Sequence, residues 1–432
     1  MENKNMKKTI LAALCVTALM MSSCESYDNI VPEKYNKIIS LQNAGEQPLN
    51  LYRTGENTIY TITAMKGGYT PDVAAKATVS VMNEIEFAEY KEISGQDYKI
   101  LPAECYTLNN AELDFTPADR WKKAELAVNP NIVGKYVKDG SEGYVIPLIA
   151  KSATDSVLSS ANIIILKPRA VIDPSLSFRN LTQNTLTTEM GSGGGTIELP
   201  MAMQVENLWN FTVKVEVDPA TTTIPKENFE LDNAGKIVFE KGKNGKLTIK
   251  VKKLETIVNN KIGLKVSGIE GKPFAYSKNV VCVNILGPKF PLKADMLSSN
   301  AVEPREGSLA NLLDGNVSTF FHSLWSSKIS EKHWLQVNLP ESTSYFQFNY
   351  TNRQNNGNAA LKDFDVMVGP DDSHLTLLRN FTLSDGLPTG GAGTFASPEL
   401  KTEQPIKVIR FICNKSFGGQ FWVWSELSIR HL

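Results

Sequence analysis

Residues 211–215 read Phe-Thr-Val-Lys-Val, with apolar and polar side chains in alternation, and residues 77–82 (Ala-Thr-Val-Ser-Val-Met) repeat the pattern. Side chains of a strand point alternately to its two faces, so this period of two predicts strands with one buried face. Gly, Asn, Asp and Pro separate many such runs, which is typical of antiparallel sheets. Helix signals are few, and the clearest is residues 83–90, where Asn83 caps a short helix ahead of Gly95. We therefore expect an all-β protein.

An internal repeat of roughly 120 residues is visible and predicts tandem copies of one domain. The matching strand signals are residues 106–108, 113–115 and 124–128 in the first copy and residues 229–231, 237–239 and 246–251 in the second. Strand number, spacing and length in each copy indicate a β-sandwich of immunoglobulin type. The expected organisation is two immunoglobulin-like spacer domains, residues 35–168 and 169–289, followed by a third domain, residues 290–432.

Charge and cysteine content exclude several classes of partner and site. The chain has 45 Lys and Arg against 46 Asp and Glu, for a net charge of -1. A nucleic-acid-binding surface needs an excess of basic side chains, so we expect no nucleic acid partner. There are five cysteines and no Cys-x-x-Cys. Two fall in the leader and the other three lie one in each predicted domain, so we expect no structural disulfide.

The N-terminus carries an export signal. Lysines precede an apolar run over residues 10–21, which is too short to span a membrane and typical of a signal peptide. Residues 19–24 (Leu-Met-Met-Ser-Ser-Cys) resemble a bacterial lipobox, which implies a lipoprotein signal peptide over residues 1–23, a lipid-anchored Cys24 and a polar tether over residues 24–34. The alternative is an ordinary secretory cleavage site. The acidic start after Cys24 resembles that of lipoproteins of the Gram-negative outer membrane that face the cell surface.

The first repeat also has a family resemblance. Residues 98–102, leading into Tyr106, and residues 144–147 (Tyr-Val-Ile-Pro) resemble the N-terminal domain of surface lipoproteins in Sus-type glycan-utilisation systems. That resemblance implies a spacer role, no catalytic residues in this region, and outer-membrane glycan transporter proteins as partners.

The last third of the chain holds all four His and four of the six Trp. Its motifs are residues 311–319 (Asn-Leu-Leu-Asp-Gly-Asn-Val-Ser-Thr), 321–325 (Phe-His-Ser-Leu-Trp), 333–339, 350–354 (Tyr-Thr-Asn-Arg-Gln) and 425–429. In this order they resemble the discoidin family, also called coagulation factor 5/8 type C, and within it the family 32 carbohydrate-binding modules. The resemblance implies an eight-stranded jelly-roll β-sandwich.

The resemblance also implies a structural calcium ion. It assigns Asp314, Asn316, Thr319 and Glu426 as ligands, with Asn316 acting through its carbonyl. Calcium takes six to eight oxygen ligands, which a turn rich in Asp, Asn, Gly and Thr supplies. The alternative is an Asp-Gly turn pinned by hydrogen bonds without metal.

Sugar binding pairs a flat aromatic ring with directional hydrogen-bonding groups. The resemblance assigns Trp325 as the stacking platform and His322 and Arg353 as donors to a galactose-like sugar. Phe417 and Trp422, in the final loop, extend the platform. The alternatives are a core tryptophan, a histidine bonded to backbone and an arginine in a surface ion pair. Glu303 or Glu306 is a candidate acidic contact.

No catalytic motif is recognised: Gly-x-Ser-x-Gly, His-Glu-x-x-His and a P-loop are all missing from the sequence. We therefore expect a non-catalytic, cell-surface glycan-binding lipoprotein that captures carbohydrate for a Sus-type uptake system. The alternative is an adhesion or structural surface protein whose C-terminal module binds protein.

Overall fold

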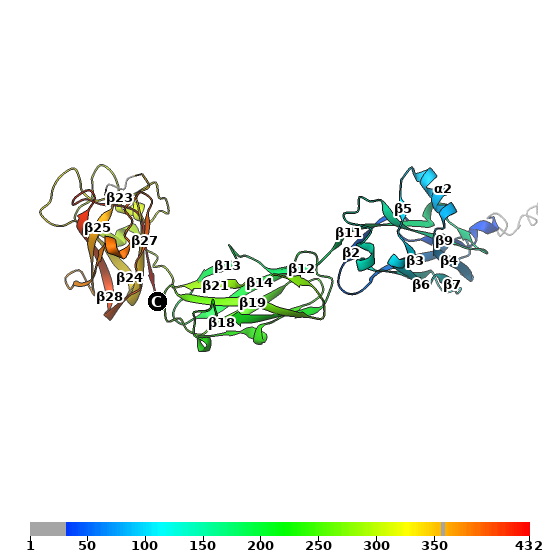
Figure 1. The fold of residues 1–432 in the computed structure, drawn as a ribbon, viewed down its shortest axis with the longest axis horizontal. Coiled ribbons are helices and arrows are strands. Elements are labelled where there is room, and N and C mark those ends of the chain that lie inside the picture. Colours follow the sequence, from blue (N-terminus) through cyan, green and yellow to red (C-terminus); the bar gives the residue numbers. More distant parts are fainter. Residues whose placement is uncertain (1–31, 356–358) are drawn as a thin grey trace, which may run out of the picture. The chain divides into compact units, whose positions relative to one another are not determined.

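The computed structural model describes residues 32–355 and 359–432 (Figure 1). The signal peptide, Cys24 and most of the tether lie outside the described residues. The chain divides into two compact units: the first ends at Pro174 and takes in Lys272–Ala275, and the second comprises Ser175–Gly271 and Tyr276–Leu432. The described part is almost entirely β, as the alternating pattern predicts.

The first unit holds a β-sandwich of a five-stranded sheet, in the order β10-β1-β3-β8-β6, and a second sheet, in the order β2-β11-β9-β4-β7 with β5 beside β9. Its elements are η2 (Glu33–Tyr35), β1 (Ile38–Leu41), β2 (Gly45–Tyr52), β3 (Thr58–Gly67), β4 (Ala75–Val81), α2 (Glu84–Ser94), β5 (Lys99–Ile100), η3 (Ala103–Cys105), β6 (Tyr106–Asn109), β7 (Glu112–Phe115), β8 (Trp121–Val128), α3 (Pro130–Val133), β9 (Tyr144–Lys151), β10 (Ser156–Val157), η4 (Ser159–Ala161) and β11 (Ile163–Ile172).

The second sandwich is built from sheets in the orders β16-β18-β14-β12-β20 and β13-β21-β19-β15-β17. Its elements are β12 (Ser175–Phe178), β13 (Thr185–Glu189), β14 (Gly195–Met203), β15 (Phe211–Asp218), η5 (Lys226–Asn228), β16 (Phe229–Leu231), η6 (Asp232–Gly235), β17 (Lys236–Phe239), β18 (Gly245–Val251), β19 (Asn260–Glu270), β20 (Ala275–Tyr276) and β21 (Val281–Leu286).

The two sandwiches repeat one topology. β6 pairs with β8 as β16 pairs with β18, and the parallel pair β2 and β11 corresponds to the parallel pair β13 and β21. The remaining strands follow in the same order in both copies. The sequence repeat therefore corresponds to a repeated fold, confirming the expectation of two tandem sandwiches.

The predicted helix is α2, and it extends one turn beyond Tyr90. The Asn83 side chain accepts hydrogen bonds from the backbone N–H groups of Ile85 and Glu86, and Glu86 accepts in return from the Asn83 backbone N–H. This reciprocal arrangement satisfies N–H groups that a helix start leaves unpaired. Gly95 ends the helix with φ of 66°, a left-handed conformation that costs glycine little.

The C-terminal domain is a jelly-roll sandwich whose eight strands form one hydrogen-bonded system, in the order β23-β29-β24-β28-β25-β26 with β22 and β27 beside β24. Its elements are η7 (Ala294–Met296), β22 (Leu297–Ser299), η8 (Leu309–Leu312), β23 (Phe321–His322), β24 (Trp334–Asn352), β25 (Leu361–Gly369), β26 (Thr376–Thr382), η9 (Leu383–Asp385), β27 (Thr394–Ala396), β28 (Leu400–Ser416) and β29 (Val423–His431).

An aromatic core holds this domain together. Phe348 packs against Phe364, Phe381 and Phe411, with ring centroids 5.0–6.2 Å apart. Tyr350 stacks on Trp424 at 4.3 Å. Offset and edge-to-face ring pairs stabilise a core beyond the burial of their area. A rigid core of this kind fixes the ends of the strands from which the loops project.

Two further features concern cysteine and the membrane. Cys105 and Cys413 are buried and Cys282 is half-buried, and all three are free thiols. Burial raises the pKa of Cys105 to about 11 and that of Cys413 to about 12.

In the ranges 32–355 and 359–432, no helix has the length and apolar character needed to cross a bilayer.

Candidate functional site

Three loops meet at one end of the C-terminal sandwich. His322 ends β23 opposite Val423 of β29, and Arg353 follows β24, whose last residue, Asn352, lies opposite Trp424. The final loop, between β28 and β29, returns to the same end. The strand register therefore brings together loops that are far apart in the sequence.

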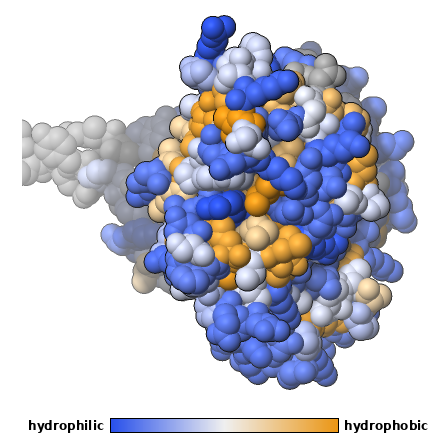
Figure 2. Space-filling model, turned by 90° about the vertical axis from the view of Figure 1, so that its left-hand side faces the viewer, coloured by the Kyte–Doolittle hydropathy of each residue, from blue (hydrophilic) through white to orange (hydrophobic). Residues whose placement is uncertain are grey.

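Trp325 is an exposed aromatic ring at this end, with 47% of its surface accessible. A buried carboxylate fixes its loop: Glu303 Oε2 accepts the backbone N–H groups of Trp325 and Ser326 at 3.1 and 3.0 Å. The indole Nε1–H donates to Glu306 Oε1 at 3.0 Å. Both the backbone and the ring of Trp325 are thus held in place. The face of the molecule drawn in Figure 2 is mostly hydrophilic, with small apolar patches.

Glu303 has a structural role. Burial raises the pKa of its carboxyl, but the backbone N–H groups of Ser326 and Trp325 outweigh burial and the net pKa is lowered. An ionised carboxylate that accepts backbone N–H groups forms stronger bonds than a neutral one. Of the two predicted acidic candidates, Glu306 is therefore the one left at the surface beside the indole.

His322 is almost fully buried, at 4% exposed. Its Nδ1 lies 2.6 Å from the Ser323 carbonyl oxygen, which only accepts, so Nδ1 carries the proton. Burial lowers the pKa of His322, which favours the neutral ring. Nε2, 3.9 Å from Glu306 Oε1, is then an acceptor. The sequence predicted a donor at this position, and the structure favours an acceptor.

Arg353 lies flat on Phe320, with its guanidinium carbon 3.7 Å from the ring centroid. Its side chain makes no hydrogen bond or ion pair with the described part of the chain. A guanidinium stacked on a ring keeps its in-plane N–H groups available. Phe320 was not predicted; the only sequence signal for it is its place directly before the 321–325 motif.

The two residues predicted from the final loop have different environments. Phe417 is exposed, and the Lys362 ammonium lies 3.9 Å from its ring centroid. Trp422 is 0% exposed and packs edge-on against Phe321 and Trp424. The prediction of Trp422 as a ligand contact is therefore wrong, because this ring belongs to the core.

The predicted calcium ligands lie together. Asp314 Oδ2 accepts from the Thr319 hydroxyl at 2.6 Å, and Oδ1 accepts from the Asn316 backbone N–H at 2.8 Å. These bonds, that of Thr319 first, lower the pKa of Asp314. Glu426 of β29 adjoins this turn, and burial together with the Asp314 charge raises its pKa. Two carboxylates, a hydroxyl and a backbone carbonyl thus share one small region.

Glu426 Oε1 provides a test of whether a cation fits. This oxygen is buried and has no hydrogen-bond partner among the described residues. Nearby carboxylates repel each other, and a buried acceptor without a donor is costly. An oxygen-only donor set suits a hard cation, so the residues fit calcium. Within the described ranges, no three His, Cys, Asp or Glu side chains cluster as metal ligands. The turn therefore offers two carboxylates, those of Asp314 and Glu426, and its other oxygens come from a hydroxyl and a backbone carbonyl.

Family models match two parts of the chain. Residues 297–427 match the F5/8 type C domain, and residues 31–157 match a family of N-terminal domains. The C-terminal sandwich is thus an F5/8 type C, or discoidin, domain. No curated protein matches the chain.

Solved structures resemble the chain at low identity. The family 32 carbohydrate-binding module of NanJ from Clostridium perfringens, in complex with galactose, is 18% identical, with 33% of this chain and 98% of that chain covered and a TM-score of 0.27. The C-terminal domain of a chitobiase from Bacteroides fragilis is 17% identical, covering 34% and 98%, with a TM-score of 0.28. A two-domain protein of unknown function from the same species is 12% identical, covering 92% and 95%, with a TM-score of 0.25. Likenesses at this level carry no argument about a ligand.

Proposed function

We propose that this protein is a non-catalytic surface lipoprotein that binds glycans through its C-terminal domain and presents them to a Sus-type uptake system. The observation that carries the proposal is the fixed, exposed Trp325 ring beside Glu306, His322 and Arg353. An apolar aromatic face surrounded by hydrogen-bond donors and acceptors is the combination that recognises a sugar. The F5/8 type C match and the resemblance of residues 321–325 to a motif of sugar-binding modules support the same function.

Each residue has a distinct part in this site. Trp325 covers the C–H face of the sugar ring. Arg353 donates to hydroxyl oxygens while Phe320 holds its guanidinium plane, and the unprotonated Nε2 of His322 accepts from a hydroxyl. Phe417 enlarges the apolar area for a second sugar unit.

The charge of the site favours neutral sugars. Glu306 carries a negative charge next to the platform, and it offsets the positive charge of Arg353. A uronic or sialic acid carboxylate that approached Glu306 would meet a like charge, and like charges in a partly desolvated site repel. The proposed ligand is therefore an uncharged, galactose-like glycan.

A glycan array tests this function. When the protein is applied to the array in buffer with calcium, we expect it to be retained on neutral galactose-containing glycans. We expect weaker retention on uronate-containing glycans than on neutral ones. Chelator is expected to reduce retention, because the metal turn adjoins the site. Retention on proteins such as collagen or fibrinogen, with no retention on any glycan, would favour an adhesion protein and contradict glycan capture.

Structural calcium is part of the proposal. Asp314, Thr319, Glu426 and the Asn316 carbonyl are the residues that would hold it. The ion would supply positive charge between the two carboxylates and satisfy the unpartnered oxygen of Glu426. By tying the turn to β29, these four residues would stabilise the end of the sandwich from which the sugar-binding loops project.

The lipid anchor is a further part of the proposal, and Cys24 is its attachment point. Replacing Cys24 with alanine removes the sulfur that accepts the lipid, so the Cys24→Ala protein is expected to leave the membrane fraction and become soluble in cell extracts. Cys282→Ala, which changes a thiol far from the leader, is the matched control and should remain in the membrane fraction. A Cys24→Ala protein that is processed normally and stays with the membrane would show that the anchor lies elsewhere.

A further inference from the structure

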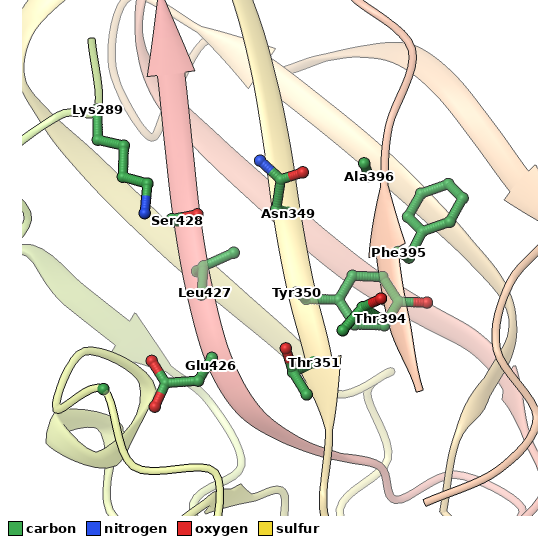
Figure 3. Close-up of a pocket in the computed structure, with 11 residues that line it drawn as sticks. Lys289, Asn349, Tyr350, Thr351, Thr394, Phe395, Ala396, Glu426, Leu427 and Ser428 are labelled. Atoms are coloured by element: carbon green, nitrogen blue, oxygen red, sulfur yellow. The ribbon is translucent and has the colours of Figure 1, made fainter. Parts of the chain in front are cut away.

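A hollow lies on the outer face of the C-terminal sandwich (Figure 3). It shares no residue with the Trp325 site. Its volume is about 360 Å³, and strands β24, β27 and β29 form its floor. Gly315, next to Asp314, also lines it, and the Lys289 side chain lies at the end opposite Glu426 (Figure 3). The volume is within the range of small-molecule sites.

Strand register builds this floor from polar side chains. Thr351 of β24 lies between Glu426 of β29 and Thr394 of β27, and in the next row Asn349 lies between Ser428 and Ala396. Directly paired residues of neighbouring strands project to the same face, so all six share the outer face. The residues that alternate with them, such as Tyr350 and Leu427, are buried on the other side.

The polar groups of the hollow have no partners in the described parts of the protein. Within residues 32–355 and 359–432, the side chains of Lys289, Asn349, Thr351, Thr394 and Ser428 make no hydrogen bond or ion pair. Glu426 also lines the hollow, but it is assigned to the calcium turn and is not counted among them.

The next row of the same face differs. Gln347 Nε2 donates to the Ser397 carbonyl at 2.7 Å, and Arg430 binds Glu189 and the Gly287 carbonyl. Gln347 and Arg430, directly outside the hollow, are thus paired within the protein, and the polar side chains inside it are left for a ligand or for water.

We propose that this hollow is a second saccharide site, which binds one uncharged sugar residue. The Asn349 amide both donates and accepts, and the Thr351, Thr394 and Ser428 hydroxyls do the same, as a ring with several hydroxyls requires. The methyl groups of the two threonines and of Ala396 contact its C–H groups. Lys289, at one end, adds one further donor, and Glu426, at the other, belongs to the calcium turn and takes no part in the sugar contact.

This site goes beyond the proposed glycan capture, because it gives one domain two points of attachment. Two weak sites on one rigid domain engage a polysaccharide together, and the second contact then forms at a high effective concentration. Polymeric glycans would therefore be retained far better than monosaccharides even though no single contact is tight.

Saturation-transfer NMR on the full mature chain tests the site. The probes are methyl β-D-galactopyranoside, methyl β-D-glucopyranoside and methyl α-D-mannopyranoside, each added separately with calcium present. A Trp325→Ala, Arg353→Ala double variant removes the first site. We expect at least one probe to receive saturation from this variant.

Two changes in that background locate the binding. Ala396→Trp fills the hollow from its exposed rim, and it is expected to lower the saturation transfer by about fivefold because the sugar is excluded sterically. Asn349→Ala removes the central amide, and it is expected to lower the transfer by about the same factor, as for one or two lost hydrogen bonds. Gln404→Ala, an exposed amide on β28 outside the hollow, is the matched control and should change nothing. Asn349→Ala keeps the test valid if the larger tryptophan disturbs β27. The proposal is overturned if no probe receives saturation from the double variant, or if transfer survives both changes. On the glycan array, the retention that the Trp325→Ala, Arg353→Ala double variant loses relative to the wild type reports the first site, so failure of one site is distinguishable from failure of the other.

Discussion

Trp325→Ala lowers the affinity for a galactose-containing glycan below the range that calorimetry measures, while the domain stays folded and weaker binding at the hollow on β24, β27 and β29 is still detected by saturation transfer. A shallow sugar site binds a monosaccharide with a dissociation constant on the order of millimolar, about -4 kcal/mol. Truncating a central tryptophan typically costs about 2 kcal/mol or more, which moves the dissociation constant beyond the measurable range. Because the ring is exposed, its loss should change folding stability by no more than about 0.5 kcal/mol. Isothermal titration calorimetry measures the affinity, and thermal unfolding measures the stability.

Arg353→Ala should have the same effect, since it removes the donors held by Phe320. Arg353→Lys keeps the charge but loses the planar group, so only partial recovery is expected. Trp121, 58% exposed on the first sandwich, provides the matched control, and Trp121→Ala should bind normally. Wild-type affinity in folded Trp325→Ala and Arg353→Ala proteins would contradict the assignment. The surface around Phe417 would then be the next candidate.

Removing calcium lowers the melting temperature of the C-terminal domain. An ion that binds only the folded state stabilises it by about 2.7 kcal/mol at a hundredfold excess over its dissociation constant, which corresponds to roughly 5–10 °C for a domain of this size. Tryptophan fluorescence follows this domain well, because four of the six tryptophans belong to it. Melting curves with calcium and with chelator measure the difference.

Asp314→Ala should abolish the response to chelator, because one of the two carboxylates is lost. Asp371, an exposed aspartate that also accepts backbone N–H groups in its turn, offers the matched control. Asp371→Ala should keep the full response. Identical wild-type melting curves in calcium and in chelator would count against a structural ion of appreciable affinity.

Much of the fold could be predicted because its determinants are local. Alternation in stretches such as residues 211–215 sets which face of a strand is buried, and a repeated pattern gave a repeated topology. The start of α2 depends on Asn83 and its end on Gly95, both of which are visible in sequence. The pairing of β27 with the C-terminal end of β24 had no such local signal, because it joins segments more than 40 residues apart.

The site was predictable in position but not in environment. Motif spacing placed His322, Trp325 and Arg353 in loops, and the strand ends bring those loops together. Burial could not be read in the same way: residues 422–425 are all buried, which breaks the alternation that separates core from surface. The proton position of His322 depends on one carbonyl contact that only the folded backbone creates. Likewise, the binding of Glu303 to two N–H groups of the Trp325 loop is a tertiary effect.

The buried thiols have a practical consequence for experiments on this protein. With a pKa of about 11, about one Cys105 thiol in 10⁴ is ionised at neutral pH, and Cys413 is ionised still less. The thiolate is the form that reacts with maleimides and disulfides. In a Cys282→Ala background, which removes the half-buried thiol, a cysteine introduced at an exposed position, such as Ala396 at the rim of the hollow, should therefore take up a spin or fluorescent label well before Cys105 and Cys413 react. Ligand arrival at this face can then be followed directly.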